Sequence, residues 1–182
     1  HPSNLNVGVG YQLSSILHQP IQIFAHENNS IELVLRELER VSDMPGTKYV
    51  VAFFPSFFTG EIEIEGKFYQ FKFNERGSEL PDHYQQLIAE KMYSFNLDTF
   101  TLNFINKLET IVQKLKSKNI HFCFAMAESN LSVGGDYWAL DPNSLSIKSW
   151  AEQNQYLNSF GFLSAKGHTE LAKLIIPYLT NQ

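Results

Sequence analysis

The side chains best suited to chemistry in this 182-residue sequence are its six histidines and the hydroxyls and carboxylates near them. His26 is followed directly by Glu27. A histidine oriented by a carboxylate is the general base of serine-type hydrolases, and such a pair is also common on protein surfaces. We expect His18, His83 and His121 to be solvated or core residues, because they fall at a helix end, on a helix and in a strand. No two histidines or acidic residues have the spacing of a metal site, so we expect neither a metal nor a cofactor.

Polar residues also follow two predicted strands. Residues 20–25 predict a short buried strand, and the β-branched and aromatic run 48–54 predicts a fully buried parallel strand. Asn28 and Asn29 follow the first strand, and Ser56 follows the second. Ligands of open α/β sheets bind at the carboxyl ends of the strands, so these three side chains are candidates for substrate binding. They are also the default residue types of turns, and that interpretation stays open.

The elements that would position these residues alternate along the first third of the chain. Apolar residues at three- and four-residue spacings predict a helix over 5–17, and Ser30 caps a second predicted helix over 31–41. Together with the two strands, the order is helix, strand, helix, strand, which is typical of an α/β sheet with right-handed crossovers. Two alternating segments around Gly66 predict a β-hairpin over 61–73 that is inserted outside the parallel sheet.

The middle of the chain continues this pattern. Two helices are predicted over 81–95 and 97–116, followed by a buried strand over 119–126. The second of these helices has one apolar stripe, formed by Leu102, Ile105, Leu108, Ile111, Val112 and Leu115. Residues 127–140 predict a loop long enough to form an active-site rim or a lid, and a further helix is expected over 142–153.

The last segment, 158–176, combines a cap with an apolar helix. Ser164 can cap a helix, and apolar residues follow at helical spacing between Leu171 and Ile175. An exposed turn therefore leads directly into a helix that docks on the core. We expect Pro177 to end this helix.

The sequence Leu163-Ser164-x-x-Gly167-His168, followed by an apolar helix, resembles the closing motif of SGNH/GDSL-type esterases and acyltransferases. The order of elements over residues 5–54 is similar to that superfamily as well. A hairpin soon after the strand that ends at residue 54 resembles its alginate O-acetyltransferase-like branch. The resemblance implies one SGNH-like domain over 1–182, with a three-layer, doubly wound α/β fold and a mostly parallel central sheet.

In that superfamily a first strand ends in a Gly-Asp-Ser turn that carries the nucleophile. This chain has neither that strand nor that turn before its first helix, so the resemblance implies a nucleophile upstream of His1, with a partner domain there as a further expectation. The oxyanion donors of the superfamily map near Asn28 and Asn29 and near Ser56.

The proton-transfer residues of the superfamily are replaced in this chain. The general base maps to Phe162 and its acid partner to Ser159 or Phe160, and none of these side chains transfers a proton. His168 matches a second, helix-borne histidine that is usually structural, and it stands about one and a half helical turns from the base position. His168 and His26 are therefore the candidate bases, and a packing or capping role for His168 stays open.

Three functions are compatible with this resemblance and with the residues that depart from it. The first is a serine-type ester hydrolase or acyltransferase acting on acyl or O-acetyl esters, with a glycan ester as one candidate substrate. The second is an inactive SGNH-like domain that binds a carbohydrate or a partner protein through exposed aromatic rings; the candidate rings are Tyr137, Trp138, Phe160 and Phe162. The third is a flavodoxin-like doubly wound domain whose function lies in its neighbours, although no nucleotide-binding motif is present.

Composition limits these functions further. The chain is 43% hydrophobic and 14% aromatic, which is enough for a single core. Its 14 basic and 19 acidic residues give a net charge of -5, so we do not expect nucleic-acid binding. The single cysteine, Cys123, is expected to be buried and does not indicate a compartment. No stretch approaches the roughly 20 apolar residues of a membrane span, and no signal sequence opens the chain.

Overall fold

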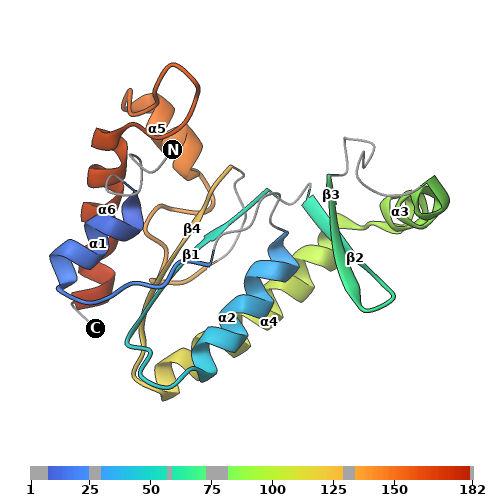
Figure 1. Ribbon diagram of the computed structural model, residues 1–182, viewed down its shortest axis with the longest axis horizontal. Coiled ribbons are helices and arrows are strands. Elements are labelled where there is room, and N and C mark those ends of the chain that lie inside the picture. The colour runs from blue at the N-terminus through green and yellow to red at the C-terminus, as the bar shows by residue number, and fades with distance from the viewer. Residues whose placement is uncertain (1–7, 25–29, 57–58, 73–81, 129–133, 181–182) are drawn as a thin grey trace.

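The computed structural model describes residues 8–24, 30–56, 59–72, 82–128 and 134–180 as a mixed α/β structure (Figure 1). Within these residues there are six helices, a parallel pair of strands and an antiparallel pair. In chain order the elements are α1 (Val9–Leu17), α2 (Ile31–Asp43), β1 (Tyr49–Phe54), β2 (Thr59–Ile64), β3 (Lys67–Lys72), α3 (Asp82–Ser94), α4 (Leu97–Ser117), β4 (His121–Met126), α5 (Ile147–Gln153) and α6 (Ala165–Thr180). No helix among them is long and apolar enough to cross a membrane.

The parallel pair β1 and β4 forms the centre of the structure, with Tyr49 opposite His121 and Phe54 opposite Met126. Side chains of a strand alternate between its faces. On one face, Val50 and its alternate neighbours pack against α2 and α4. On the other face, the remaining side chains of both strands, including the buried Cys123, pack against α1, α5 and α6. Both faces of the pair are therefore covered by helices, as Figure 1 shows.

The two edges of this pair differ. At the outer edge of β4, the backbone N–H of Phe124 donates to the carbonyl of Tyr137 at 2.9 Å, and the N–H of Ala139 donates to the carbonyl of Phe124 at 2.9 Å. Residues 137–139 thus add a short parallel bridge beside β4. At the outer edge of β1, no strand is paired within the described residues.

The predicted hairpin is confirmed as a separate antiparallel sheet formed by β2 and β3. Its turn consists of Glu65 and Gly66 with φ angles of 51° and 76°, which is the geometry of a two-residue hairpin turn. Arg36 on α2 holds the hairpin through two hydrogen bonds to the buried Glu61 carboxylate, at 2.5 and 3.1 Å. The Arg36 guanidinium also lies 4.0 Å from the ring centre of Phe68.

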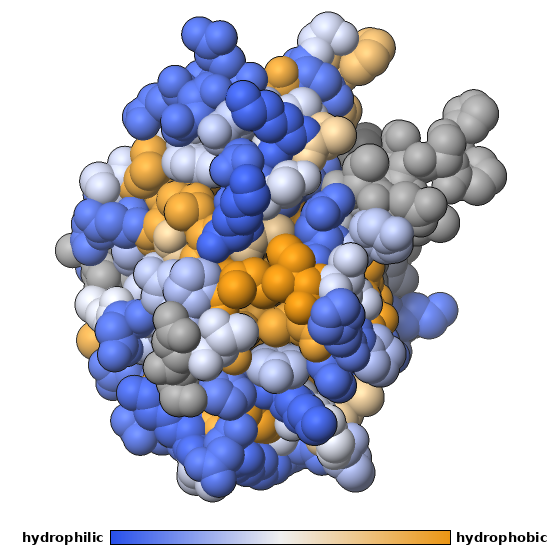
Figure 2. Space-filling model, turned by 90° about the vertical axis from the view of Figure 1, so that its left-hand side faces the viewer, coloured by the Kyte–Doolittle hydropathy of each residue, from blue (hydrophilic) through white to orange (hydrophobic). Residues whose placement is uncertain are grey.

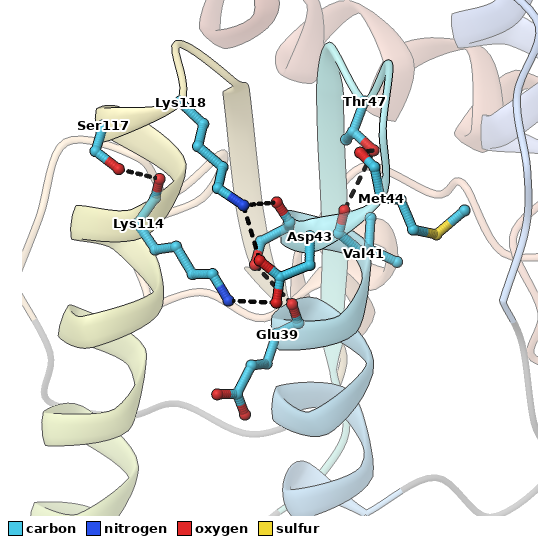
Figure 3. A network of polar contacts seen from close by, with 9 residues as sticks. Glu39, Val41, Asp43, Met44, Thr47, Lys114, Ser117 and Lys118 are labelled. Carbon is cyan, nitrogen blue, oxygen red and sulfur yellow. Dashed lines mark hydrogen bonds and ion pairs between the residues drawn. The ribbon is translucent and has the colours of Figure 1, made fainter.

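The carboxyl ends of α2 and α4 are tied together by an ion-pair network (Figure 3). The Asp43 carboxylate accepts hydrogen bonds from Lys114 at 2.7 Å and from Lys118 at 2.8 Å. The Lys118 amine also donates to the carbonyl of Ser42 at 2.9 Å. Both lysines lie at the carboxyl end of α4, where their charge also complements the helix dipole.

The prediction of a strand over 20–25 is wrong for residues 20–24, which are the part of this segment that the structure describes. Residues 20–24 form no strand, and Ile21, Ile23 and Phe24 are exposed. The physical reason is that a strand exists only when its backbone pairs with a neighbour, and none of the described residues pairs with this segment.

Three smaller predictions about helices also need correction. The helix expected over 142–153 begins only at Ile147, because Ser146 and Ser149 form a reciprocal capping box there. Pro177 does not end α6, which continues to Thr180. Leu102 is exposed although the predicted stripe of α4 included it, whereas the stripe from Leu108 onward is buried.

Candidate functional site

The carboxyl end of β1 is where the sequence places most of its candidate binding residues. α2 packs against β1 and ends just before it, so the start of α2 lies at the same end of the sheet as the end of β1. Ser56 lies there. Its carbonyl accepts hydrogen bonds from the backbone N–H of Thr59 at 3.2 Å and from the Thr59 hydroxyl at 2.7 Å. The candidates His26, Asn28 and Asn29 belong to residues 25–29, outside the described part of the chain.

Glu32 is a carboxyl at this end of the sheet that sequence analysis did not select. It lies in the first turn of α2, after the cap in which Ser30 Oγ accepts from the N–H of Leu33 at 3.1 Å. Burial raises the pKa of the Glu32 carboxyl, and its Oε2 is buried without a hydrogen-bond partner. An acidic residue in a first turn is ordinary in any helix, so the sequence holds no signal for this environment.

A basic side chain lies close to Glu32. The Lys91 amine on α3 donates to the backbone carbonyl of Glu61, and its charge partly offsets the effect of burial on the pKa of Glu32. Burial therefore favours the protonated form of the Glu32 carboxyl relative to an exposed glutamate. None of the described histidines is hydrogen-bonded to it.

His168 lies in the first turn of α6 and is half-buried. Its backbone N–H donates to the carbonyl of Ser164 at 3.0 Å, while its ring Nδ1 is buried without a hydrogen-bond partner. Burial lowers the pKa of the imidazole and so favours its neutral form. A general base needs an orienting acceptor at its second nitrogen, and the structure assigns none to this ring. The geometry favours a packing role for His168.

The closing turn before α6 is held by a dense set of backbone contacts. The N–H of Asn158 donates to the carbonyl of Phe162 at 2.7 Å, and the side-chain Oδ1 of Asn158 accepts from the N–H groups of Phe160 and Phe162 at 2.9 and 3.1 Å. Gly161 adopts a φ of 78°, which favours glycine. The rings of Phe160 and Phe162 are 82% and 71% exposed. The turn therefore presents two aromatic side chains to solvent from an ordered backbone.

The closing motif positions this turn against the end of α5. The N–H of Ser164 donates to the carbonyl of Tyr156 at 2.7 Å, and the hydroxyl of Ser164 accepts from the N–H of Gly167 at 3.2 Å, which confirms the predicted cap. A Cβ atom at Gly167 would lie 2.8 Å from the carbonyl oxygen of Tyr156. The glycine of the motif is therefore required for close packing.

The aromatic platform expected from Tyr137, Trp138, Phe160 and Phe162 is not assembled. Trp138 is buried against Phe54 and Phe124, and its indole N–H donates to the carbonyl of Gly134 at 3.3 Å. Tyr137 is buried beside it. These two rings fill the core between β4 and α4, so of the four candidate rings only Phe160 and Phe162 are exposed.

A cavity of about 500 Å³ lies along the open edge of β1. We call it the edge groove; it is bounded by α1, residues 19–24, α2 and β1. Apolar residues also reach the surface on the side where α1 and α6 lie, as Figure 2 shows. The sequence gives no signal for this groove, although residues 20–24 that line it belong to the run predicted to form a strand.

No group of three or more histidine, cysteine or acidic side chains in the described residues is placed to hold a metal ion. Comparison with known proteins found no relative: no family model matches the sequence, and neither a curated protein nor a solved structure matches it significantly.

Proposed function

We propose that this chain is an SGNH-like domain of doubly wound, three-layer type that binds a carbohydrate through its closing turn and does not cleave an ester with its own side chains. The observation that carries the proposal is the exposed pair Phe160 and Phe162 on an ordered turn. In the resemblance to SGNH proteins, this turn occupies the place of the catalytic acid and base.

The chemistry of the turn supports binding over proton transfer. In the resemblance, the base maps to Phe162 and the acid to Ser159 or Phe160, and none of these side chains can act as an acid or a base. The ring Nδ1 of the neighbouring His168 is buried without a hydrogen-bond partner, so no acidic group orients this imidazole as a base. Among the described residues of the closing segment, no side chain therefore replaces the missing base.

The physical form of the turn suits a sugar ligand. The apolar face of a pyranose ring packs on an aromatic ring, and an exposed phenylalanine provides such a face. Because Asn158 already fixes the backbone of the turn, little conformational entropy is lost when a ligand binds. Large exposed apolar side chains that lie close together are typical of interaction sites.

Single and double substitutions test this proposal. We expect Phe160→Ala and Phe162→Ala each to weaken binding of a neutral oligosaccharide about fivefold, since one aromatic contact contributes about 1 kcal/mol. Tyr93→Ala is the matched control, because Tyr93 is 96% exposed on α3. Binding is measured by NMR titration with a panel of neutral oligosaccharides. Binding that persists unchanged in the double variant would refute the proposal, as would the absence of binding to every oligosaccharide in the panel.

An ester hydrolase or O-acyltransferase is the second candidate, and the edge groove favours it. A strand that filled the groove parallel to β1 would end beside Ser56, near which the resemblance places one of the oxyanion donors. The test uses the protein extended by the residues that its gene encodes before His1. Labelling by a fluorophosphonate probe and hydrolysis of p-nitrophenyl acetate would establish this candidate, and failure of both reactions would eliminate it.

A further inference from the structure

The β2–β3 hairpin has two faces of different chemistry, and a different helix packs against each. Ile64 and Phe71 leave one face and form a small apolar core with Ile88 of α3. Glu61 and Gln70 lie directly opposite each other in the hairpin, so their side chains leave the other face together. That second face packs against α2, and Figure 1 shows the hairpin between α2 and α3. The contact between α2 and the hairpin is therefore polar.

Two acceptor oxygens are buried at this polar contact without a hydrogen-bond partner. One is Oε2 of Glu32 on α2, and the other is Oε1 of Gln70 on the hairpin. Glu32 stands one helical turn before Arg36, so both side chains lie on the face of α2 that meets the hairpin. The Arg36 guanidinium cannot serve these oxygens, because it already donates two hydrogen bonds to the Glu61 carboxylate. Burying an acceptor without a donor is unfavourable, so the contact favours an additional hydrogen.

The charged groups around Glu32 favour a proton over a metal ion as the species that satisfies this contact. Arg36 on α2 and Lys91 on α3 place two positive charges beside the carboxyl, and both would repel a cation. Lys91 also donates to the backbone carbonyl of Glu61. The Glu61 carboxylate of β2 opposes ionisation of Glu32, whereas Lys91 and the hydroxyl of Ser30 favour it. A hydrogen on the Glu32 carboxyl itself adds a donor without adding a positive charge.

We propose that Glu32 is a pH switch that controls how the hairpin docks on α2. The neutral carboxyl donates its O–H within the contact, with Oε1 of Gln70 as the acceptor on the opposite wall. Ionisation removes that hydrogen and leaves a buried negative charge, so the hairpin and α3 loosen from α2. Glu32 belongs to α2 and the closing turn to the segment before α6, so the switch does not depend on the proposed carbohydrate binding.

The direction of the switch follows from the burial of the carboxyl. Burial raises the pKa of Glu32 above its ordinary value of 4.5. A carboxyl whose pKa is raised by folding contributes stability while it is protonated, and that stability is lost as the pH rises through the pKa of the folded state. Docking is therefore complete in acid and weakens toward higher pH. Because Thr59 at the start of β2 bonds to the carbonyl of Ser56, a loosened hairpin also alters the carboxyl end of β1.

NMR of the whole chain tests the switch with two measurements over the range from about pH 3 to about pH 9. The first follows the side-chain Cδ resonance of Glu32 and gives the pKa of this carboxyl directly. The second gives amide-exchange protection factors for β2 and β3, with β4 as the internal reference because it belongs to a separate core. We expect the Glu32 midpoint to lie above 4.5. Across that midpoint, the protection of the hairpin amides should fall at least about tenfold while that of β4 is unchanged.

Two glutamine variants separate Glu32 from the other carboxylates. Glu32→Gln keeps the shape of the side chain, is neutral and has donor hydrogens at every pH. Its hairpin protection should change less than about twofold over the range in which the parent changes tenfold. Glu63→Gln is the matched control, because Glu63 is an exposed carboxylate on the same face of the same hairpin. This control should follow the parent.

Four results would overturn the proposal. The first is a Glu32 midpoint at or below 4.5, and the second is a hairpin whose protection stays constant while Glu32 titrates. The third is an equal pH dependence in Glu32→Gln and the parent, since another group would then be responsible. The fourth is a parallel loss of protection in β4, because the pH would then act on the whole fold. If Glu32→Gln does not fold, agreement between the Glu32 midpoint and the hairpin transition in the parent, with β4 unchanged, still decides the question.

Discussion

Replacing Gly167 by alanine tests whether the closing motif exists for packing. In an ordinary helix this change stabilises a protein by up to about 1 kcal/mol, because glycine is the poorer helix former. Here the added Cβ would lie 2.8 Å from the carbonyl oxygen of Tyr156 and 3.0 Å from Leu163 Cδ2. The first contact is with backbone and cannot be relieved by a side-chain rotation. Overpacking of this kind costs about 1–3 kcal/mol, so we expect a net loss of about 1 kcal/mol.

The matched control is Gly10→Ala in α1. The nearest atom to its added Cβ is Cδ1 of Ile23 at 3.1 Å, which belongs to an exposed and flexible side chain. The gain in helix propensity should therefore dominate, and we expect stability to be unchanged or raised by up to about 1 kcal/mol. The free energies of unfolding of the two variants should therefore differ by about 1–2 kcal/mol, with Gly167→Ala the less stable of the two.

Urea unfolding of both variants measures this difference. Trp150 reports on the affected junction, because its ring centre lies 5.0 Å from that of Tyr156. A shift of Tyr156 would also strain the hydrogen bond from Ser164 to its carbonyl, so amide exchange in the closing turn should accelerate in Gly167→Ala. If Gly167→Ala is instead more stable than the parent, the packing explanation of the motif is refuted.

Three further predictions concern charge and burial. Hydrogen bonds from two lysines at the end of α4 lower the pKa of Asp43 from 3.8 to about 2. The stability that these pairs provide is therefore present above about pH 4 and is lost as the pH falls toward 2. In Asp43→Asn, the free energy of unfolding should fall less over that pH window than in the parent, as measured by acid titration. Arg36→Ala should destabilise the protein by about 1–2 kcal/mol in urea unfolding, because Glu61 then remains buried without its bidentate partner, and an equal stability of Arg36→Ala and the parent would contradict this. Burial raises the pKa of Cys123 to about 12, so the folded protein should resist a thiol reagent at pH 8 and react only after unfolding; rapid labelling of the native state would show that the thiol is accessible.

Features with local causes can be predicted from the residues alone. The cap at Ser30 requires only a side-chain oxygen within reach of the backbone N–H three residues later. The hairpin requires two residues with positive φ between alternating segments, and Glu65-Gly66 provides them. The buried stripe of α4 and the parallel strands β1 and β4 follow from the spacing and density of their apolar residues. The pattern therefore predicted the type of each of these elements correctly.

Only the tertiary structure decided the features that depend on a distant partner. A helix satisfies its hydrogen bonds within itself, whereas a strand needs a neighbour. The strand-like residues 21–24 therefore remain outside the sheet, because no described segment pairs with them. Packing between distant segments also places Trp138 in the core. It leaves Nδ1 of His168 and Oε2 of Glu32 buried without hydrogen-bond partners. Residue type and spacing carry no information about these surroundings, because packing between remote segments creates them.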